Sequence, residues 1–352
     1  TLGDAADTSG NFFISSIPPG DYVLIVSMIG YEIRKIPIRL LDSETKSLQI
    51  ELSPKVLQGR QITVTARFPK EWAKNLKIFE KAFFGLTDFA KKCRLINPEV
   101  LDFRYDMSSG HFEATAEQPV RFANEALGYE VSFILERFTL DLASGNLYSV
   151  SQEENLVVLQ EAGIQCKGIL RFAPLQARNK KETQTWQKNR RRAYNGSFQH
   201  FLRSLWNDRV QEEGFEIFGT EFPHAKDEQK LKREDILHDV AKREEKLLSF
   251  PAYLKVVFKN ESDPICQQVQ LQLLERLNWT DEDQVDIALE QVYRKCGRQV
   301  SWLRIRNAGG ILINKRGQVL SRNAEIEFAG YWKWNTLGES LPITYADSSI
   351  VN

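Results

Sequence analysis

The opening 66 residues alternate short runs of β-forming side chains with turn residues, and this alternation limits the possible fold more than any other feature. In "SIPPGDYVLIVSMIGYE" (16–32), Pro19 and Gly20 fit the central positions of a type II turn over residues 18–21, because proline presets φ and glycine accepts a positive φ. The run at 22–26 carries apolar or aromatic side chains on both alternating sets. This pattern predicts a strand that is covered on both faces.

Other short segments around this run have the same character. They are "NFFISS" (11–16), "EIRKIPIRL" (32–40), "SLQIEL" (47–52) and "QITVTA" (61–66). Short strands at close spacing, with turn residues between them, predict a small antiparallel β-sandwich over residues 1–66.

Three motifs occur in order within this region: D-x-x-G-x-F, I-P-x-G-x-Y and S-x-I-G-Y-E. With them, residues 1–66 resemble the carboxypeptidase-like regulatory domain, a transthyretin-like β-sandwich found in envelope proteins of the Bacteroidetes. The resemblance implies the periplasm or cell surface of a Gram-negative bacterium. Because that family begins with two more strands and this chain opens at Thr1, we expect an N-terminal truncation, with any signal peptide or lipid anchor before Thr1.

Residues 67–352 combine helical and strand patterns, which predicts an α+β domain with a mostly antiparallel sheet. An amphipathic helix is expected up to Gly85, with its apolar face formed by Trp72, Leu76, Phe79, Phe83 and Phe84. Strands are expected at 101–106, 111–117, 128–142 and 163–172. The apolar phase of the third strand slips at Glu136 and Arg137, which predicts a β-bulge there.

Further along, a helical segment is expected over 182–213 and a strand over 253–258. A helix is expected from an N-cap at Thr280 to Gly297, followed by strands at 300–305 and 309–320, the latter with a hairpin turn at 315–317. The segment 266–277 fits a strand and a helix equally well.

Four stretches in this second part also resemble a domain that follows the regulatory sandwich in uncharacterised Bacteroidetes proteins. They are "EWAKNLKIFEKAFFG", "NEALGYEVSF", "NRRRAYNGSFQHFLRSL" and "GYWKWNTLGESLPITY", within residues 70–345. This resemblance implies an envelope setting and brings no known chemistry with it.

Charge and cysteine usage narrow the class of protein. Lysine plus arginine and aspartate plus glutamate both total 47, so no overall field favours nucleic acid or an anionic membrane. No apolar run reaches the roughly 18 residues that a transmembrane helix needs. The cysteines are dispersed, without a C-x-x-C pair, which favours buried thiols over structural zinc, while an oxidising compartment would permit one or two disulfides; they are Cys93, Cys166, Cys266 and Cys296.

The sequence lacks the motifs of familiar enzymes. A carboxypeptidase-type zinc site needs H-x-x-E and a distant histidine, but the four histidines begin "HFEA", "HFLR", "HAKD" and "HDVA". H-E-x-x-H, G-x-S-x-G, the P-loop and G-x-G-x-x-G are also missing. We therefore predict no metal site and no cofactor.

One helical face between residues 190 and 210 is a candidate ligand site. On a continuous helix, Gly196 would open a notch one turn before His200, flanked by Arg192 and Arg203, with Asn207 on the same face. Such a notch would suit a carboxylate, phosphate or sugar acid. The alternative is that Asn195-Gly196 forms a turn between two helices and Ser197 caps the second.

Two further segments allow a functional and a structural interpretation. Trp332 and Trp334 lie two apart in "GYWKW", so on a strand they could form a sugar-binding platform, but core tryptophans are commoner. The basic segment 179–192 could contact nucleic acid, but in a neutral protein it is more often ordinary surface.

Together these features predict a non-enzymatic binding or assembly protein of the cell envelope. Its partner would be another envelope protein or a glycan or anionic ligand, and no nucleic acid. The alternative is a hydrolase or transferase that acts on envelope glycans or anions through His200, with Arg192 and Arg203.

Overall fold

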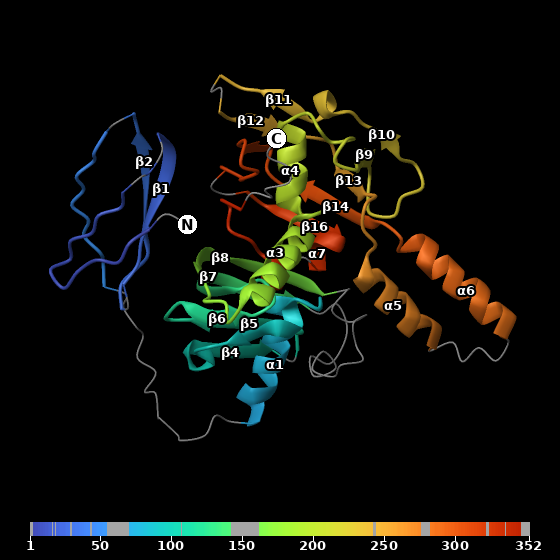
Figure 1. Cartoon of the computed structure of the whole chain (residues 1–352), viewed down its shortest axis with the longest axis horizontal. Coiled ribbons are helices and arrows are strands. Elements are labelled where there is room, and N and C mark those ends of the chain that lie inside the picture. The colour runs from blue at the N-terminus through green and yellow to red at the C-terminus, as the bar shows by residue number, and fades with distance from the viewer. Residues whose placement is uncertain are drawn as a thin grey trace.

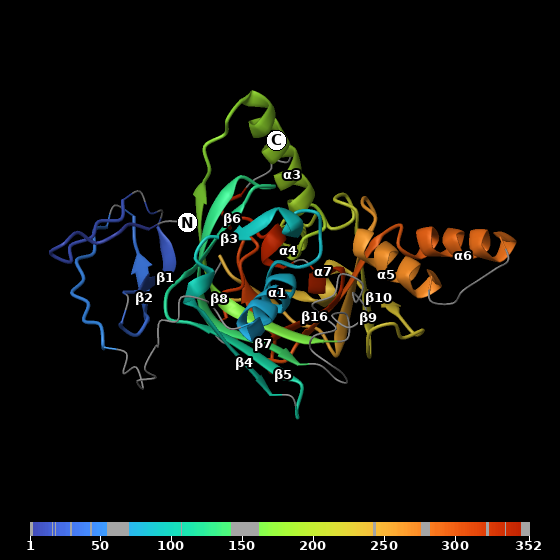
Figure 2. The ribbon, with the colours of Figure 1, turned by 90° about the horizontal axis from the view of Figure 1, so that it is seen from below.

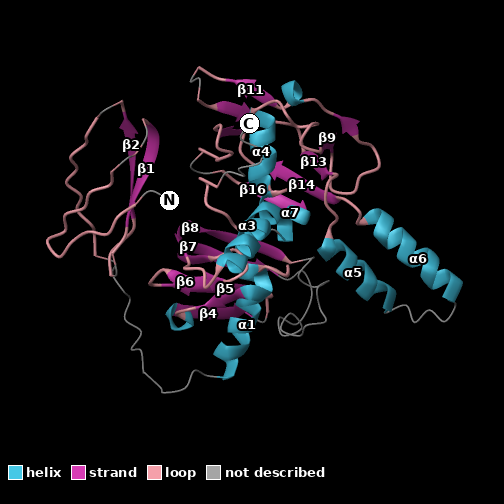
Figure 3. Cartoon of the chain, in the orientation of Figure 1, coloured by secondary structure: helices cyan, strands magenta, loops and turns pink. Residues whose placement is uncertain are grey.

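A computed structural model describes residues 3–15, 17, 19–28, 30–42, 44–54, 70–106, 108–141, 162–241, 244–275, 282–321, 324–334 and 336–345. Within these residues the chain consists mostly of antiparallel β-sheets with a few helices (Figure 3). Strands β1 and β2 lie at one side of the molecule, and helices α5 and α6 project from the opposite side (Figure 1).

The N-terminal region contains one antiparallel pair, β1 (Gly20–Val26) and β2 (Arg34–Leu40). Both strands were predicted. The prediction that β1 is covered on both faces is wrong, because Val23 is 46% exposed. Gly20 has a positive φ of +155°, which opens the strand and differs from the roughly +80° of a type II turn.

Two other strands predicted in this region are not formed by the described residues. Residues 11–15 are irregular, and Phe13 is 71% exposed, so this apolar run finds no sheet to join. Residues 47–52 also carry no ladder, although Tyr31 and Pro54 form an isolated bridge next to them. The predicted strand at 61–66 lies outside the described residues.

A six-stranded antiparallel sheet follows helix α1 (Lys70–Phe84). Its strands are β3 (Cys93–Leu95), β4 (Leu101–Asp106), β5 (His111–Ala116), β6 (Val120–Asn124), β7 (Tyr129–Asp141) and β8 (Gly163–Pro174). The short 3₁₀ helix η1 (Ala90–Lys92) leads into β3, and η2 (Pro98–Val100) lies between β3 and β4. The bulge is confirmed, because the β7–β8 register shifts between Leu135 and Arg137.

The bulge divides β7 between two neighbours. Its first half pairs with β6 and its second half with β5, while β8 pairs with it on both sides of the shift. Helix α1 lies against this sheet (Figures 1 and 2). The first core forms here from aromatic side chains of α1 and the sheet, chiefly Phe79, Phe83, Phe112, Phe122, Phe133 and Phe138.

The second half of the chain builds two smaller antiparallel sheets. One has the order β10 (Gln229–Lys230), β9 (Phe215–Thr220), β13 (Tyr253–Phe258), β14 (Gln299–Ile305), β16 (Ile326–Gly330). The other contains β11 (Leu237–Asp239), β12 (Lys246–Leu248) and β15 (Ile311–Ile313), and η4 (Arg233–Asp235) precedes it. The predicted strands at 253–258 and 300–305 are confirmed. The predicted turn at 315–317 is confirmed by the bridge between Ile313 and Val319.

Helix α4 (Phe198–Trp206) follows α3 (Lys180–Tyr194) and packs Phe201, Leu202 and Leu205 into the second core. The undecided segment 266–277 lies largely in α5 (Pro264–Glu275), where Ile265 and Val269, four apart, reach the first core. Helix α6 (Glu282–Lys295) ends just before Gly297, and its predicted cap Thr280 lies outside the described residues. No described helix is both long and apolar enough to cross a membrane.

A short C-terminal segment joins the two cores. It contains α7 (Tyr331–Trp334) and η5 (Leu337–Glu339). Trp332 belongs to the second core and Trp334 to the first. Asn124, on β6, donates from Nδ2 to the carbonyl of Gly338 at 2.8 Å. The two halves are thus packed against each other through this segment.

Candidate functional site

Of the two arrangements that the sequence allows for residues 190–210, the structure has the turn at Asn195-Gly196 between two helices, and the continuous helix is wrong. Helix α3 ends at Tyr194, Gly196 adopts a φ of +70°, and α4 begins at Phe198. Ser197 caps α4, because its hydroxyl accepts from the His200 amide at 3.1 Å. A side chain at position 196 would overlap Oε1 of Gln299 and lie 2.8 Å from Phe258. The glycine therefore serves a tight turn and leaves no open notch.

His200 is buried, 3% exposed, and both ring nitrogens have partners. Nδ1 accepts from the Gly196 amide at 3.1 Å, so the proton of the neutral ring must lie on Nε2. Nε2 then donates to Oε2 of Glu213 at 3.0 Å. Tyr194 and Phe215 pack on the ring, with centroids 4.7 and 4.8 Å away. The imidazole thus holds the helix break against the loop that precedes β9.

Ser204 completes this cluster by donating its hydroxyl to the same Glu213 oxygen. Burial acts to raise the pKa of Glu213, but hydrogen bonds from His200 and Ser204 and the charge of Arg209 outweigh it, so the pKa lies below its usual value. In a Ser-His-Asp triad the histidine accepts the serine proton, whereas Ser204 donates to Glu213 and both ring nitrogens of His200 have partners. The cluster is therefore not arranged as such a triad, and its hydrogen bonds connect α4 to the loop before β9.

The two predicted arginines do not converge on an anion site. Arg203 donates to three carbonyls: Nε to Arg316 at 2.9 Å, Nη1 to Tyr345 at 2.6 Å and Nη2 to Ile343 at 2.7 Å. Arg192 lies over the ring of Phe89, 5.1 Å from its centroid. Asn207 is the exposed C-cap of α4. Arg203 therefore anchors the C-terminal segment.

Of the two interpretations of Trp332 and Trp334, the structure has core tryptophans rather than a platform on a strand, because "YWKW" forms helix α7. Trp332 and Trp334 are each 5% exposed. Nε1 of Trp332 donates to the Gly196 carbonyl at 2.7 Å. The structure therefore connects three of the predicted residues, Gly196, His200 and Trp332, but inside the core.

Helix α3 is docked on the protein through one face, while most of its lysines and arginines are exposed. Trp186 donates from Nε1 to the Glu125 carbonyl at 2.9 Å. Arg190 donates to the carbonyls of Leu127 and Gly128, at 2.7 and 3.2 Å. These contacts dock α3 on the turn between β6 and β7, and the exposed basic side chains on its other faces fit the interpretation as ordinary surface.

A group of buried carboxyls lies where the two halves meet. Burial raises the pKa of Glu339 to about 7 and that of Asp263 to about 6, and it raises the pKa of Glu261. The charge of Arg192 acts to lower the pKa of Glu339 and of Glu261, whereas Glu261 and Asp263 act to raise the pKa of Glu339. Among the described residues, no set of three or more histidine, cysteine or acidic side chains could hold a metal ion.

The cysteine interpretation needs a correction. Cys266, in α5, and Cys296, just after α6, form a disulfide with Cα atoms 5.5 Å apart, whereas Cys93 and Cys166 are free. The sequence spacing of 30 residues gave no signal for this pairing. Two adjacent helices bring the sulfurs together, and sequence reasoning could find it only after placing both helices side by side.

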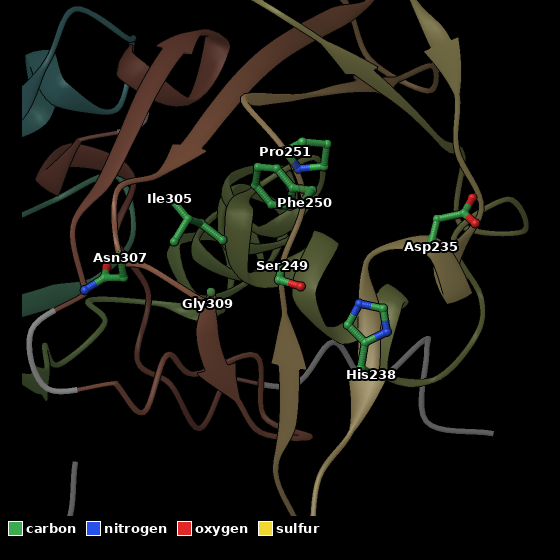
Figure 4. Close-up of a pocket in the computed structure, with 9 residues that line it drawn as sticks. Asp235, His238, Ser249, Phe250, Pro251, Ile305, Asn307 and Gly309 are labelled. Atoms are coloured by element: carbon green, nitrogen blue, oxygen red, sulfur yellow. The ribbon is translucent and has the colours of Figure 1, made fainter.

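Two surface hollows contain residues that the sequence did not single out. One, of 330 Å³, lies beside β11 and β12 and includes His238, Ser249 and Phe250 (Figure 4). The other, of 590 Å³, lies over β5 and β7 at the bulge. There Nδ1 of His111 lies 2.5 Å from Oδ1 of Asp141, and Glu136 pairs with Lys35 of β2.

The comparisons with known proteins concern the N-terminal region. Residues 1–64 match the family model of the CarboxypepD_reg-like domain. No curated protein and no solved structure matches the chain.

Proposed function

We propose that this chain is a non-enzymatic binding or assembly protein of the Gram-negative cell envelope, located in the periplasm or at the cell surface. A CarboxypepD_reg-like domain is commonly a binding or regulatory module, and residues 1–64 match one. The partner would be another envelope protein or an envelope glycan or anion.

The observation that carries this proposal is that the candidate side chains bind other groups of the same chain or are buried. His200 has a partner at each ring nitrogen, and Arg203 binds three carbonyls. Trp332 and Trp334 are buried. Chemistry at this cluster would require these bonds to break, so binding through the surface is the simpler function.

The Cys266–Cys296 disulfide supports the proposed compartment. Disulfides persist in oxidising environments such as the periplasm and are rare in the reducing cytosol. The envelope setting implied by the N-terminal resemblance and the oxidised cysteine pair point to the same side of the inner membrane.

The domain arrangement is part of the proposal. A transthyretin-like sandwich would occupy residues 1–66, and an α+β domain would occupy residues 67–352. An isolated two-stranded pair such as β1–β2 is marginally stable, which supports a fuller sandwich around it. The ion pair between Lys35 and Glu136 connects this region to the six-stranded sheet.

Co-sedimentation with envelope components tests the proposal. The purified chain would be incubated with isolated peptidoglycan sacculi and, separately, with outer-membrane vesicles, and the supernatant assayed for released reducing sugars. We expect saturable binding to one of them without sugar release. Release of reducing sugars by the wild-type chain would instead overturn the non-enzymatic assignment.

The location is tested by fractionating cells that produce the full-length protein, with periplasmic, outer-membrane and cytoplasmic marker proteins as references. We expect the protein with the periplasmic or outer-membrane markers. Recovery only with the cytoplasmic marker would overturn the envelope assignment.

A further inference from the structure

The hollow of 330 Å³ lies between the β11–β12 pair and the loop after β14 (Figure 4). This volume is at the small end of the range for ligand pockets, roughly 300–1,000 Å³, and leaves room for a single sugar residue. Figure 4 shows Asp235 and His238 on one side and Ile305 and Asn307 on the other, with Ser249 between them.

Strand pairing brings the two main polar groups to one face. The Ser249 amide donates to the Ile236 carbonyl at 2.9 Å, one residue beyond the Leu237–Leu248 pair. His238 is then the diagonal neighbour of Ser249 on the same face, at a typical Cα separation of about 7–8 Å. This spacing lets one small molecule contact both side chains.

A glycine sets the wall opposite these strands. Gly310 has a φ of +95°, and a Cβ there would lie 2.7 Å from Cβ of Ser249 and overlap the Leu248 carbonyl. Only glycine lets the loop after β14 approach β12 so closely. Asn307 is held at the other end of this loop, because its Oδ1 accepts from the Glu325 amide at 2.7 Å.

The polar groups that line the hollow suit hydroxyl groups. A serine hydroxyl and a neutral imidazole can each donate and accept, as sugar hydroxyls do. Within the described part of the chain, neither the His238 ring nor the Ser249 hydroxyl has a hydrogen-bond partner, so both are available. Among the described residues that line the hollow there is no lysine or arginine, and their one charged side chain, Asp235, would repel an anion.

Apolar groups complete the lining. Phe250, Pro251 and Ile305 border the same hollow (Figure 4). An aromatic ring and aliphatic side chains can pack against the C–H face of a sugar ring while the polar groups bind its hydroxyls. We propose that this hollow binds a neutral saccharide. The inference rests on the proposed binding function and gives it a ligand class.

Saturation-transfer NMR on the whole chain tests the site, with glucose, galactose, mannose and N-acetylglucosamine as the probes. We expect transfer to at least one of these sugars. His238→Ala and Ser249→Ala should each weaken its binding about fivefold, the effect of losing one neutral hydrogen bond. His111→Ala, which removes a partly exposed histidine in the other hollow, is the matched control and should leave binding unchanged.

Two results would overturn the inference: no transfer to any of the four sugars, or binding that is unchanged in both pocket variants. If the sugars fail but the chain still sediments with sacculi or vesicles, the saccharide site is wrong and the proposed binding function stands. If sedimentation fails while the sugars bind through His238 and Ser249, the saccharide site stands and the proposed binding to envelope components is wrong.

Discussion

Nε2 of His200 lies 3.0 Å from Oε2 of Glu213, and the other nitrogen of the same ring accepts from the Gly196 amide. Ser204, one turn along α4, bonds the same carboxylate. A continuous series of hydrogen bonds thus runs from the α3–α4 break to the loop before β9. It joins a backbone amide, an imidazole, a carboxylate and a hydroxyl. This series explains why α4 takes a fixed direction after the break.

Glu213→Ala should lower the free energy of unfolding by about 2–3 kcal/mol at pH 7, because it leaves His200 and Ser204 without their charged acceptor. Glu213→Gln keeps an acceptor and should cost about 1 kcal/mol. The Glu213 pKa is lowered in the folded state, so its contribution is present above the unfolded pKa and is lost as pH falls through the folded value. Urea denaturation at pH 7 and pH 4 measures this, and an equal loss for Glu213→Ala at both pH values would contradict it.

Arg203→Ala should lower the melting temperature and expose residues 341–345 to hydrogen exchange, since Arg203 donates to the carbonyls of Ile343 and Tyr345. Lysine at this position cannot reproduce three directed bonds, so Arg203→Lys should protect the segment only in part. Arg178→Ala, at an exposed position before α3, is the control. Unchanged exchange in Arg203→Ala would show that other contacts hold the segment.

Two glycines with positive φ should differ in their tolerance of a side chain. Gly20→Ala should lower the free energy of unfolding by about 1 kcal/mol, because alanine disfavours a positive φ. No overlap adds to this cost, because the new Cβ would meet only Tyr22, at an ordinary contact distance of 3.5 Å. Gly196→Ala should cost more, about 3 kcal/mol, because strain at φ +70° adds to overlap with Gln299. Chemical denaturation compares them, and equal costs would show that Gln299 moves aside freely.

The buried carboxyls should make part of the stability decline as pH rises. Burial raises the folded-state pKa of Glu339 to about 7, above the usual 4.5, so between these values the folded chain holds a proton that the unfolded chain has released. Stability from this group is full below about pH 4.5 and lost as pH rises through about 7.

Glu339→Gln should therefore be more stable than wild type at pH 8, by up to about 3 kcal/mol, and nearly equal to it at pH 4.5. Urea midpoints at the two pH values test this. Glu290→Gln, on the exposed side of α6, should show no such difference. A glutamine that destabilises at pH 8 would mean that the Glu339 charge is needed there.

Removing the disulfide should weaken the α5–α6 pair. The bond closes a loop of 30 residues, and loop-closure entropy gives about 3.5 kcal/mol for Cys266→Ser with Cys296→Ser. Cys166→Ser, at a free and exposed thiol, should change stability by less than about 0.5 kcal/mol. Identical unfolding of the double variant with and without a reducing agent, at wild-type stability, would contradict the prediction.

The sequence predicts well those elements whose signal is local. The apolar spacing from Trp72 to Phe84 marks α1, and the phase slip at Glu136 marks the bulge, because helix and strand periodicity are properties of neighbouring residues. Asn195-Gly196 followed by Ser197 is also a local signal, and it predicts the turn and the N-cap that separate α3 from α4.

Features that depend on distant partners could not be predicted in this way. Residues 47–52 alternate like a strand but form no ladder, because a strand needs a neighbour that local alternation does not specify. Trp332 lies in a helix because the tertiary contacts with Gly196 and Ser301 override the strand pattern. The Cys266–Cys296 bond and the pair of His238 and Ser249 likewise arise from packing between elements.

The C-terminal segment sets the order in which this protein can be completed during synthesis. Trp334 fills the first core beside α1, and Asn124 bonds the carbonyl of Gly338, 214 residues later. A ribosome that has made the six-stranded sheet has therefore not yet supplied the side chain that closes its core. The first core therefore cannot be completed until Trp334 and Gly338 have left the ribosome, and until then its apolar side chains remain within reach of chaperones.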